Sequence, residues 1–201
     1  MNSAVKNVLC LTIITVVAGA GLGYVYDITK EPIAVMEENT RQAAYRSVLP
    51  EAASFSDPVD VSSDQADVIA TAGITGTQID QAVKALDNSG ETIGYVINAT
   101  SHEGYGGDIT IAVGIDREGT VKGVEILDIS ETAGLGMKAK ESKFRDQFKG
   151  KNVKTFTYTK TGATQDFEID AISGATITTK AVTNAVNSAL AYFDKMAGGS
   201  I

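Results

Sequence analysis

Residues 92–129 read TIGYVINATSHEGYGGDITIAVGIDREGTVKGVEILDI, and this pattern specifies a β-sheet. Three runs rich in Val, Ile and Thr are separated by clusters of Gly, Ser and Asp, the residues that favour turns between strands. Residues 78–86 form a further strand candidate, which a Gly-containing turn at residues 87–90 joins to the first run. Because short turns join antiparallel neighbours, the four segments predict a largely antiparallel meander.

Helices and a second strand pair are expected on the C-terminal side of this meander. Residues 140–148 have the spacing of a short amphipathic helix. Residues 153–159 and 164–171 flank a Gly-containing turn at residues 160–162 and predict a hairpin. Apolar residues recur on one face of residues 178–196, which predicts a helix packed on the sheet. The fold class that follows is α+β, with a largely antiparallel twisted sheet and packed helices.

An apolar run precedes these elements. Residues 8–25, VLCLTIITVVAGAGLGYV, carry no charge and are long enough for a helix that crosses the ~30 Å hydrocarbon core of a bilayer. We therefore predict a transmembrane helix; a cleaved signal peptide is the alternative, because Lys6 precedes the run and AGAG offers a cleavage site. Mostly acidic residues follow the run, which favours a cytoplasmic N-terminus and a soluble domain outside the cytoplasm in the cell membrane.

The segment between the anchor and the sheet is expected to contain one helix. Pro32 stands where a first helical turn is expected, and the apolar spacing after it predicts a juxtamembrane helix that ends near Pro50. Residues 51–76 are rich in Ser, Asp, Ala and Gly and predict an irregular acidic connection with room for a short helix. The expected organisation is a cytoplasmic tip and transmembrane helix at residues 1–27, the juxtamembrane helix and connection at 28–77, and the main domain at 78–201.

The composition limits the chemistry that this chain can perform. A formal net charge of −8 and a pI near 4.7 argue against nucleic-acid binding, which requires clustered Lys and Arg. One cysteine, Cys10, and one histidine, His102, are too few for an internal disulfide, a Cys-ligated cluster or a structural zinc site. A lone loop histidine is also more often solvated than a proton donor. Redox chemistry would therefore need an organic cofactor.

The strongest local signal is the decapeptide DAISGATITT, residues 170–179, where a predicted strand ends and the last predicted helix begins. The unpaired N–H groups and the dipole of a helix N-terminus stabilise a phosphate without Lys or Arg. The alternative interpretation is a helix cap from Ser173, Thr176 or Thr178, because Ser and Thr are favoured N-caps. Residue chemistry alone leaves both interpretations open.

The residues Asp170-x-x-Ser173-Gly174-Ala175-Thr176 resemble the flavinylation motif of the FMN-binding domain family. That family includes the G subunit of Rnf-type electron transport complexes and the C subunit of the sodium-translocating NADH:quinone reductase. The resemblance implies FMN bound covalently through its phosphate to Thr176, installed by a flavin transferase that uses FAD. It also implies that Asp170 serves recognition or activation by the transferase and that Ser173 contacts the phosphate.

Two further segments resemble loops of the same family. Residues 131–136, ETAGLG, are similar to the ETPGLG loop that lies against the flavin, with Ala133 in place of proline. Residues 104–107, GYGG, are similar to a GYGG or GYSG segment, and Lys138 is a candidate for a positive charge near the flavin or simply a solvated lysine. The flavin contacts implied in addition to Thr176 are Tyr105, Glu131, Thr132, Gly134, Leu135, Gly136, Lys138, Asp170, Ser173, Gly174, Ala175, Thr178 and Thr179.

The resemblance implies an electron-carrier subunit of a membrane ion-translocating ferredoxin:NAD oxidoreductase complex of the Rnf type. Its partners would be other membrane and redox subunits, together with the transferase during maturation. One alternative is the covalent-FMN subunit of a sodium-translocating NADH:quinone reductase or of another extracytoplasmic flavin route. A second alternative, from a different class, is a membrane-anchored binding module without flavin, in which SGAT is merely a helix cap.

Overall fold

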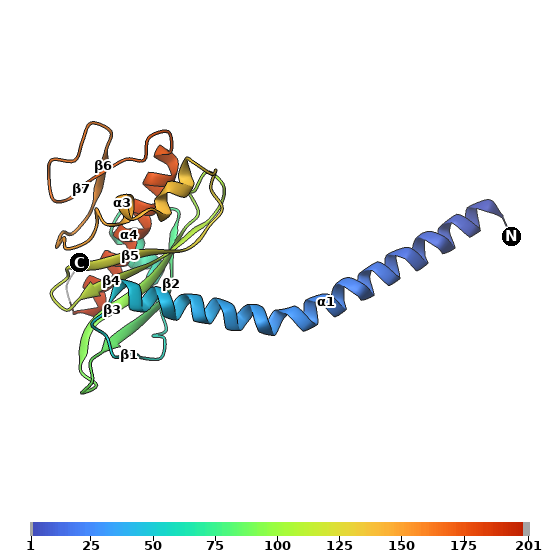
Figure 1. Cartoon of the computed structure of the whole chain (residues 1–201), viewed down its shortest axis with the longest axis horizontal. Coiled ribbons are helices and arrows are strands. Elements are labelled where there is room, and N and C mark those ends of the chain that lie inside the picture. Colours follow the sequence, from blue (N-terminus) through green and yellow to red (C-terminus); the bar gives the residue numbers. More distant parts are fainter. Residues whose placement is uncertain (1, 199–201) are drawn as a thin grey trace. The chain divides into compact units, whose positions relative to one another are not determined.

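A five-stranded antiparallel sheet forms the centre of the computed structural model, which describes residues 2–198. Each strand pairs with the next one along the chain, in the order β1 to β5 (Figure 1). The strands are β1 (Ser54–Phe55), β2 (Thr77–Leu86), β3 (Thr92–Ser101), β4 (Ile109–Asp116) and β5 (Val121–Ile129). The predicted meander of four strands is confirmed as β2 to β5, and the short β1 is added at its edge.

Helix α4 (Thr176–Met196) packs on one face of this sheet. The strand register brings one row of buried side chains across four strands toward the helix: Ala82, Ile97, Val113 and Val124. On the helix, Val182, Ala185, Val186 and Ala189 are fully buried and join the same core. The amphipathic helix expected at residues 178–196 is thus confirmed, with a start two residues earlier.

The opposite face of the sheet is covered by the C-terminal end of helix α1 (Ser3–Val48). Side chains alternate across a strand, so Val83 and Val96 face away from α4 and pack with Tyr45, Val48 and Leu49. Glycine makes the close approach feasible, because a Cβ atom at Gly114 would lie 2.6 Å from the carbonyl oxygen of Val48. Alanine there would push the helix end off the sheet.

The helix predicted after the anchor is present and ends at Val48, near Pro50 as expected, but its predicted start near Pro32 is wrong, because α1 continues without a break from Ser3 to Val48 and contains Pro32 in its interior. Proline removes one main-chain hydrogen bond, and the remaining bonds on either side maintain this helix. Among the described residues, α1 is the helix that is long and apolar enough to cross a membrane, as predicted. The chain divides into two units, Met1–Arg41 and Gln42–Ile201.

The segment at residues 51–77 is more ordered than an irregular connection. It contains β1, a bridge from Val59 to Ala82 and the short helix α2 (Gln65–Thr71). Asp64, just before α2, accepts a 3.0 Å hydrogen bond from the hydroxyl of Tyr192 and forms an ion pair with Lys195. Because Tyr192 and Lys195 belong to α4, this carboxylate fastens the segment to the C-terminal helix.

Replacing Asp64 by asparagine is expected to lower stability by ~0.2–1 kcal/mol, as for a partly exposed ion pair. The hydrogen bond from Lys195 lowers the pKa of Asp64 below its ordinary value of 3.8. The stabilisation is therefore present above the ordinary pKa and is lost as the pH falls through the lower folded pKa. Burial and the hydrogen bond to Asp64 raise the pKa of Tyr192 to about 12, so its contribution is lost as the pH rises from about 10 toward that value.

Melting temperatures of the wild type and Asp64→Asn, compared from neutral to acid pH, check this expectation. The difference between the two proteins should disappear below the folded pKa of Asp64, because the wild-type carboxylate is then protonated too. Asp166→Asn is a matched control at an exposed site. A constant difference at every pH would contradict the proposed cause.

The strands β6 (Thr157–Thr159) and β7 (Glu168–Asp170) pair in parallel, so the predicted hairpin is wrong. Side-chain hydrogen bonds redirect the intervening loop. The carboxylate of Glu168 accepts from the amides of Thr164 and Gln165, and that of Asp170 accepts from the amide of Ala163. Because of these bonds, β7 begins beside the start of β6, as parallel pairing requires, whereas in a hairpin it would begin beside the end of β6.

The helix expected at residues 140–148 is divided into two shorter elements. A 3-10 helix, η1 (Gly136–Lys140), is followed by extended backbone at Glu141 and by one turn of α-helix, α3 (Ser142–Arg145). The amphipathic pattern is nevertheless respected, because Phe144 and Phe148 are buried in the main core. Helix η1 packs against α4, and α3 packs against η1 (Figure 1).

Candidate functional site

The turn between β7 and α4 presents a helix N-terminus that no side chain caps. Ala175 is the N-cap residue, and Thr176 is the first residue of the helix. The interpretation of Ser173, Thr176 or Thr178 as a side-chain cap is therefore wrong. The first hydrogen bond of the helix runs from the amide of Thr179 to the carbonyl of Ala175, at 3.0 Å. The amides of residues 176–178 precede it, which is the arrangement that binds anions.

Thr179 holds this turn in place. Its hydroxyl accepts a 3.0 Å hydrogen bond from the amide of Ile172 and donates one of 2.9 Å to the carbonyl of Ala175. The Thr179 side chain is buried, as is that of Thr178, whereas Thr176 is only partly buried. Of the three threonines, Thr176 is therefore the most accessible. The buried Thr179 holds the turn through its two hydrogen bonds.

A cavity of about 580 Å³ lies beside Thr176. Three segments that are distant in the sequence meet there: Tyr105 from the β3–β4 loop, the loop after β5, and the start of α4. Leu135 lies against the turn, since a Cβ atom at Gly174 would be 3.1 Å from its Cδ2. The residues that line the cavity are Tyr105, Glu131, Thr132, Leu135, Gly136, Gly174, Ala175, Thr176, Ile177 and Thr178.

Glu131 ties the two loops of this cavity together. Its Oε1 accepts hydrogen bonds from the amides of Tyr105, at 2.7 Å, and Gly106, at 3.2 Å. Its Oε2 lies close to Gly136, because a Cβ atom there would be 2.6 Å from this oxygen and 2.6 Å from the hydroxyl oxygen of Thr178. Only glycine fits at position 136 without displacing the Glu131 carboxylate or helix α4.

Glu131→Ala is expected to release the loop at residues 104–107. Each amide would lose a hydrogen bond to a charged acceptor, worth ~1.5 kcal/mol, so hydrogen exchange at Tyr105 and Gly106 should become about tenfold faster. Glu131→Gln retains the Oε1 acceptor and serves as the matched control, with a smaller effect. Exchange rates that stay at the wild-type value in Glu131→Ala would show that other contacts hold the loop.

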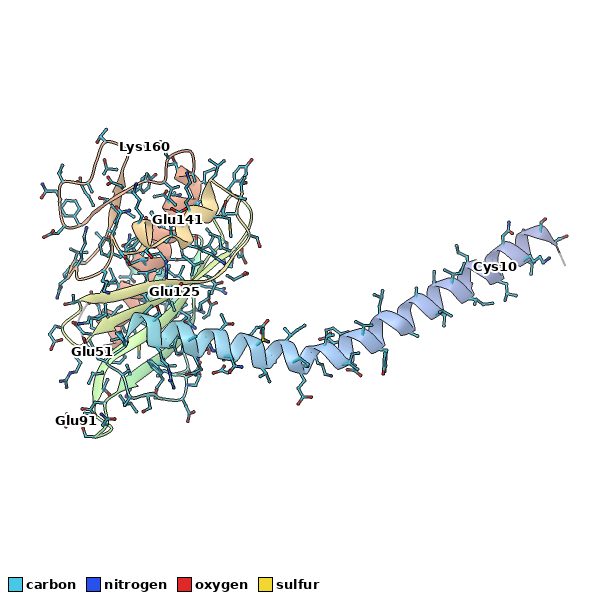
Figure 2. The ribbon with its side chains drawn as sticks, in the orientation of Figure 1. Cys10, Glu51, Glu91, Glu125, Glu141 and Lys160 are labelled. Atoms are coloured by element: carbon cyan, nitrogen blue, oxygen red, sulfur yellow. The ribbon has the colours of Figure 1, made fainter. Side chains whose placement is uncertain are left out.

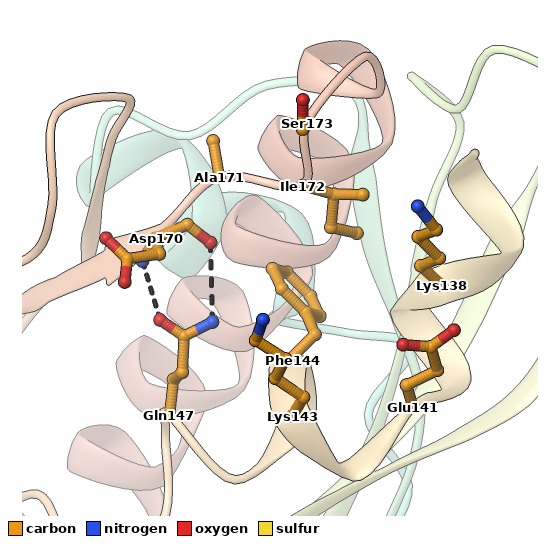
Figure 3. Close-up of a pocket in the computed structure, with 9 residues that line it drawn as sticks. All are labelled: Lys138, Glu141, Lys143, Phe144, Gln147, Asp170, Ala171, Ile172 and Ser173. Carbon is orange, nitrogen blue, oxygen red and sulfur yellow. Dashed lines mark hydrogen bonds between the residues drawn. The ribbon is translucent and has the colours of Figure 1, made fainter. Parts of the chain in front are cut away.

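A second cavity, of about 420 Å³, is lined in part by residues 170–173, which lead into the same turn (Figure 3). Lys138 and Lys143 point into it toward the segment Ala171–Ser173. The lining residues are Lys138, Glu141, Lys143, Phe144, Gln147, Asp170, Ala171, Ile172 and Ser173. Lys138, Asp170 and Ser173 thus line this second cavity and not the cavity beside Thr176.

Both the main chain and the side chain of Asp170 form hydrogen bonds within the protein. Gln147 accepts from the amide of Asp170 at 2.6 Å and donates to its carbonyl at 3.3 Å, as the dashed lines in Figure 3 show. The carboxylate accepts from the amide of Ala163 at 2.6 Å. Asp170 therefore sets the path of the chain into the turn, and its implied role toward a transferase stays a prediction.

Sequence reasoning missed Ile177, which lines the first cavity and is 51% exposed. Its position inside the decapeptide at residues 170–179, directly before the predicted helix, was the available signal. Gln147 and Phe144 were also missed, because nothing in their local sequence relates them to the turn. Gly134 lines neither cavity, and His102 lies outside both and pairs with Asp108 at 3.0 Å.

Comparisons with known proteins identify the family of this chain. Residues 104–191 match the family model of the FMN-binding domain. The G subunit of the Na(+)-translocating ferredoxin:NAD(+) oxidoreductase complex of Acetobacterium woodii is 32% identical, over 94% of this chain and 90% of that protein. The G subunit of the ion-translocating oxidoreductase complex of Methanosarcina acetivorans is 31% identical, over 96% of each chain.

A solved structure supports the fold. The C subunit of the Na(+)-translocating NADH-quinone reductase of Parabacteroides distasonis superposes with a TM-score of 0.55, over 84% of this chain and 97% of that chain. At 20% sequence identity, this likeness concerns the fold alone. The sequence relatives decide the family: the chain belongs to the family of G subunits of ion-translocating oxidoreductase complexes, and residues 104–191 are its FMN-binding domain.

Proposed function

We propose that this chain is an electron-carrying subunit of a membrane-bound, ion-translocating ferredoxin:NAD oxidoreductase complex, and that it carries FMN as a phosphoester on Thr176. The observation that carries the proposal is the position of Thr176. Its hydroxyl belongs to the first residue of α4, beside a cavity and an uncapped helix N-terminus. A phosphate esterified there would lie in the favourable field of the helix dipole.

The residues around Thr176 fit a flavin mononucleotide. The cavity volume of about 580 Å³ lies within the ~300–1,000 Å³ typical of ligand sites. Its apolar residues Tyr105, Leu135 and Ile177 are 72%, 43% and 51% exposed, and are thus free to cover an aromatic ring system. The amides of residues 176–178 supply donors for the phosphate, so the site offers an apolar part and an anion-binding part side by side.

A flavin supplies one-electron and two-electron transfer, and the protein supplies attachment and orientation. Thr176 would hold the cofactor permanently, which suits a relay outside the cytoplasm, where lost FMN could not be replaced. Glu131 would keep the loops at residues 104–107 and 131–136 closed on the ring. Thr179 would fix the turn so that the Thr176 hydroxyl and the helix amides face the same phosphate.

The attachment reaction would be a phosphoryl-group transfer from FAD catalysed by a separate flavin transferase. The bond that forms joins the Thr176 Oγ to the phosphorus of the FMN half. The bond that breaks is the pyrophosphate linkage of FAD, AMP leaves, and the hydroxyl proton is released. Asp170 and Ser173, which line the second cavity on the same turn, are the side chains that a transferase would meet next to Thr176.

We also propose that α1 anchors the chain with its N-terminus in the cytoplasm and the FMN-binding domain outside it. Lys6 precedes the apolar part of α1, and the flank that follows it is mostly acidic, with Asp27, Lys30, Glu31, Glu37 and Glu38; the proposed orientation rests on this difference. Protease protection in sealed, right-side-out vesicles tests the orientation, since the domain should be digested from outside.

Mass spectrometry of the chain purified from its native membrane tests the cofactor and its attachment. We expect FMN as a phosphoester on the peptide that contains Thr176. The same purification identifies the accompanying subunits and so separates a ferredoxin:NAD oxidoreductase from an NADH:quinone reductase. An unmodified peptide would refute covalent attachment and favour a binding module without flavin.

A further inference from the structure

The loop between β3 and β4 presents an exposed aromatic side chain on a fixed main chain. Tyr105 is 72% exposed and lines the cavity beside Thr176. Its main chain is nevertheless held, because the amides of Tyr105 and Gly106 donate to Glu131. Fixing a loop costs conformational entropy, so contacts that hold an otherwise exposed ring in one place indicate that the ring has a binding partner.

Glu103 holds the same loop from its other flank. Its Oε2 accepts a 3.1 Å hydrogen bond from the side-chain amide of Asn184 and lies 3.2 Å from the ammonium nitrogen of Lys180. Lys180 also donates to Oε1 at 3.4 Å. Because Lys180 and Asn184 belong to α4, Glu103 ties the loop to that helix. We call these three residues the Glu103 clamp.

The Glu103 clamp lies on the side of α4 that begins at Thr176. Lys180 and Asn184 follow Thr176 by four and eight residues, and residues four apart are neighbours on one side of a helix. The attachment point and the clamp thus belong to one rigid element. Since Tyr105 is two residues after Glu103, the clamp limits how far this ring can lie from Thr176.

The main chain around Glu103 is fixed as well. The amide of His102 donates to the carbonyl of Gly76 at 2.8 Å, and the amide of Glu103 donates to the hydroxyl of Ser101 at 3.3 Å. A Cβ atom at Gly76 would lie 2.6 Å from Cγ of Glu103, so glycine leaves the room that this side chain needs. The carboxylate is therefore directed to α4 by its surroundings.

We propose that Glu103 is a positioning residue of the flavin site: by binding Lys180 and Asn184, it holds Tyr105 against the ring system of a flavin on Thr176. This inference rests on the proposed function and deepens it. Glu103 lines neither cavity, so it acts through the loop and does not touch the cofactor. The attachment of FMN itself does not depend on the clamp.

Lys180 has one competing role, because a phosphate on Thr176 would lie one helical turn away from it. In the structure its ammonium group is within 3.4 Å of both carboxylate oxygens of Glu103, and the helix amides of residues 176–178 already offer donors for the phosphate. The two roles predict different results: a phosphate ligand is needed for FMN content, whereas a clamp residue is needed for the position of Tyr105.

Time-resolved flavin fluorescence of the full chain, purified with its FMN, tests the clamp. An excited flavin loses its fluorescence rapidly when a tyrosine ring is in contact with it, and Tyr105→Phe identifies the rapidly decaying fraction that is due to this ring. Glu103→Ala should lower the ratio of the rapid to the slow fraction about fivefold, as for loss of a partly exposed ion pair. The FMN content should stay at the wild-type value.

Glu51→Ala is the control, because it also removes a carboxylate that forms an ion pair, with Lys122 at 3.5 Å. Figure 2 shows Glu51 apart from Glu141, which lines the second cavity. This variant should retain the wild-type decay. An unchanged decay in Glu103→Ala, or an equal change in Glu51→Ala, would overturn the inference.

Charge reversal distinguishes positioning from a general loss of stability. Glu103→Lys alone should lose the rapid fraction, and Glu103→Lys combined with Lys180→Glu should recover most of it, because the ion pair is restored and the side-chain oxygen of Asn184 can accept from the new lysine. If Glu103→Ala does not fold, this pair of variants decides. A double variant that folds without recovering the rapid fraction would contradict the clamp.

Flavin content separates this inference from the proposed function. A wild-type chain without FMN would overturn both. A wild-type chain that carries FMN but has no rapid fraction dependent on Tyr105 would overturn the positioning role alone. Loss of FMN in Lys180→Met but not in Glu103→Ala would also overturn it, since the lysine would then serve the phosphate.

Discussion

Thr176→Ala is expected to abolish covalently bound FMN while leaving the fold intact. The change removes the hydroxyl and one methyl group from the attachment point, and Ala175, not Thr176, occupies the N-cap position without a side-chain hydrogen bond. The loss of stability should therefore stay at or below the ~0.5 kcal/mol lower limit for loss of a capping side chain. In-gel flavin fluorescence and intact mass measure the cofactor, and thermal denaturation measures stability.

Thr176→Ser is the matched control, because it retains a hydroxyl at the same position and should retain FMN. Thr178 and Thr179 cannot replace Thr176, since their side chains are 1% and 0% exposed and Thr179 is hydrogen-bonded within the turn. Covalent flavin that persists in Thr176→Ala would refute the assignment of the attachment residue. If Thr176→Ala loses both its flavin and its folded state, the loss of flavin would be due to lower stability, and thermal denaturation distinguishes that case.

Asn187→Ala is expected to have the largest effect on stability among changes outside the hydrophobic core. The buried side-chain amide of Asn187 donates to the carbonyl of Phe156 at 2.9 Å and accepts from its amide at 2.7 Å. Alanine would leave two buried main-chain groups without a partner, at ~1–3 kcal/mol each. We expect a total loss of ~2–6 kcal/mol in the free energy of unfolding, measured by urea denaturation.

Asn152→Ala provides the comparison at an exposed site. Its side chain donates one hydrogen bond of 2.8 Å to the carbonyl of Glu118. Water can replace this donor at an exposed site, so the loss in the free energy of unfolding should remain below ~1 kcal/mol. Asn187 also links α4 to Phe156, directly before β6. An Asn187→Ala protein with wild-type stability would mean that the segment around Phe156 is held by its apolar contacts alone.

Local patterns were sufficient for the elements of the main sheet and for the last helix. The strand candidates at residues 78–86 and within residues 92–129, with the short turns between them, predicted an antiparallel meander, and the structure has it as β2 to β5. The motif at residues 170–176 placed Thr176 at the start of the last helix, where it lies. These features depend on residues that are close together in the sequence, so a local sequence pattern is enough to predict them.

The pairing of β6 and β7 was not predictable from such patterns. The turn residues at 160–162 favoured a hairpin, but Glu168 and Asp170 bind amides earlier in the same loop and make the strands parallel. In the same way, Pro32 suggested a helix start, although the helix continues through it. In the first case the turn preference was outweighed by side-chain hydrogen bonds specific to this chain. In the second case the helix continues although proline removes one main-chain hydrogen bond.

Both the sequence and the tertiary structure were needed to identify the residues of the candidate site. The sequence by its residue types indicated an apolar anchor, an α+β domain and an anion-binding helix N-terminus at Thr176. Contacts between distant segments determined the rest: the tether from Glu131 to Tyr105, the burial of Thr179, and the division of the predicted contacts between two cavities. The physical reason is that these contacts join residues far apart in the sequence, such as Tyr105 and Glu131, which are 26 residues apart. Such contacts depend on how the sheet and the helix bring their loops together, and no local sequence pattern contains that information.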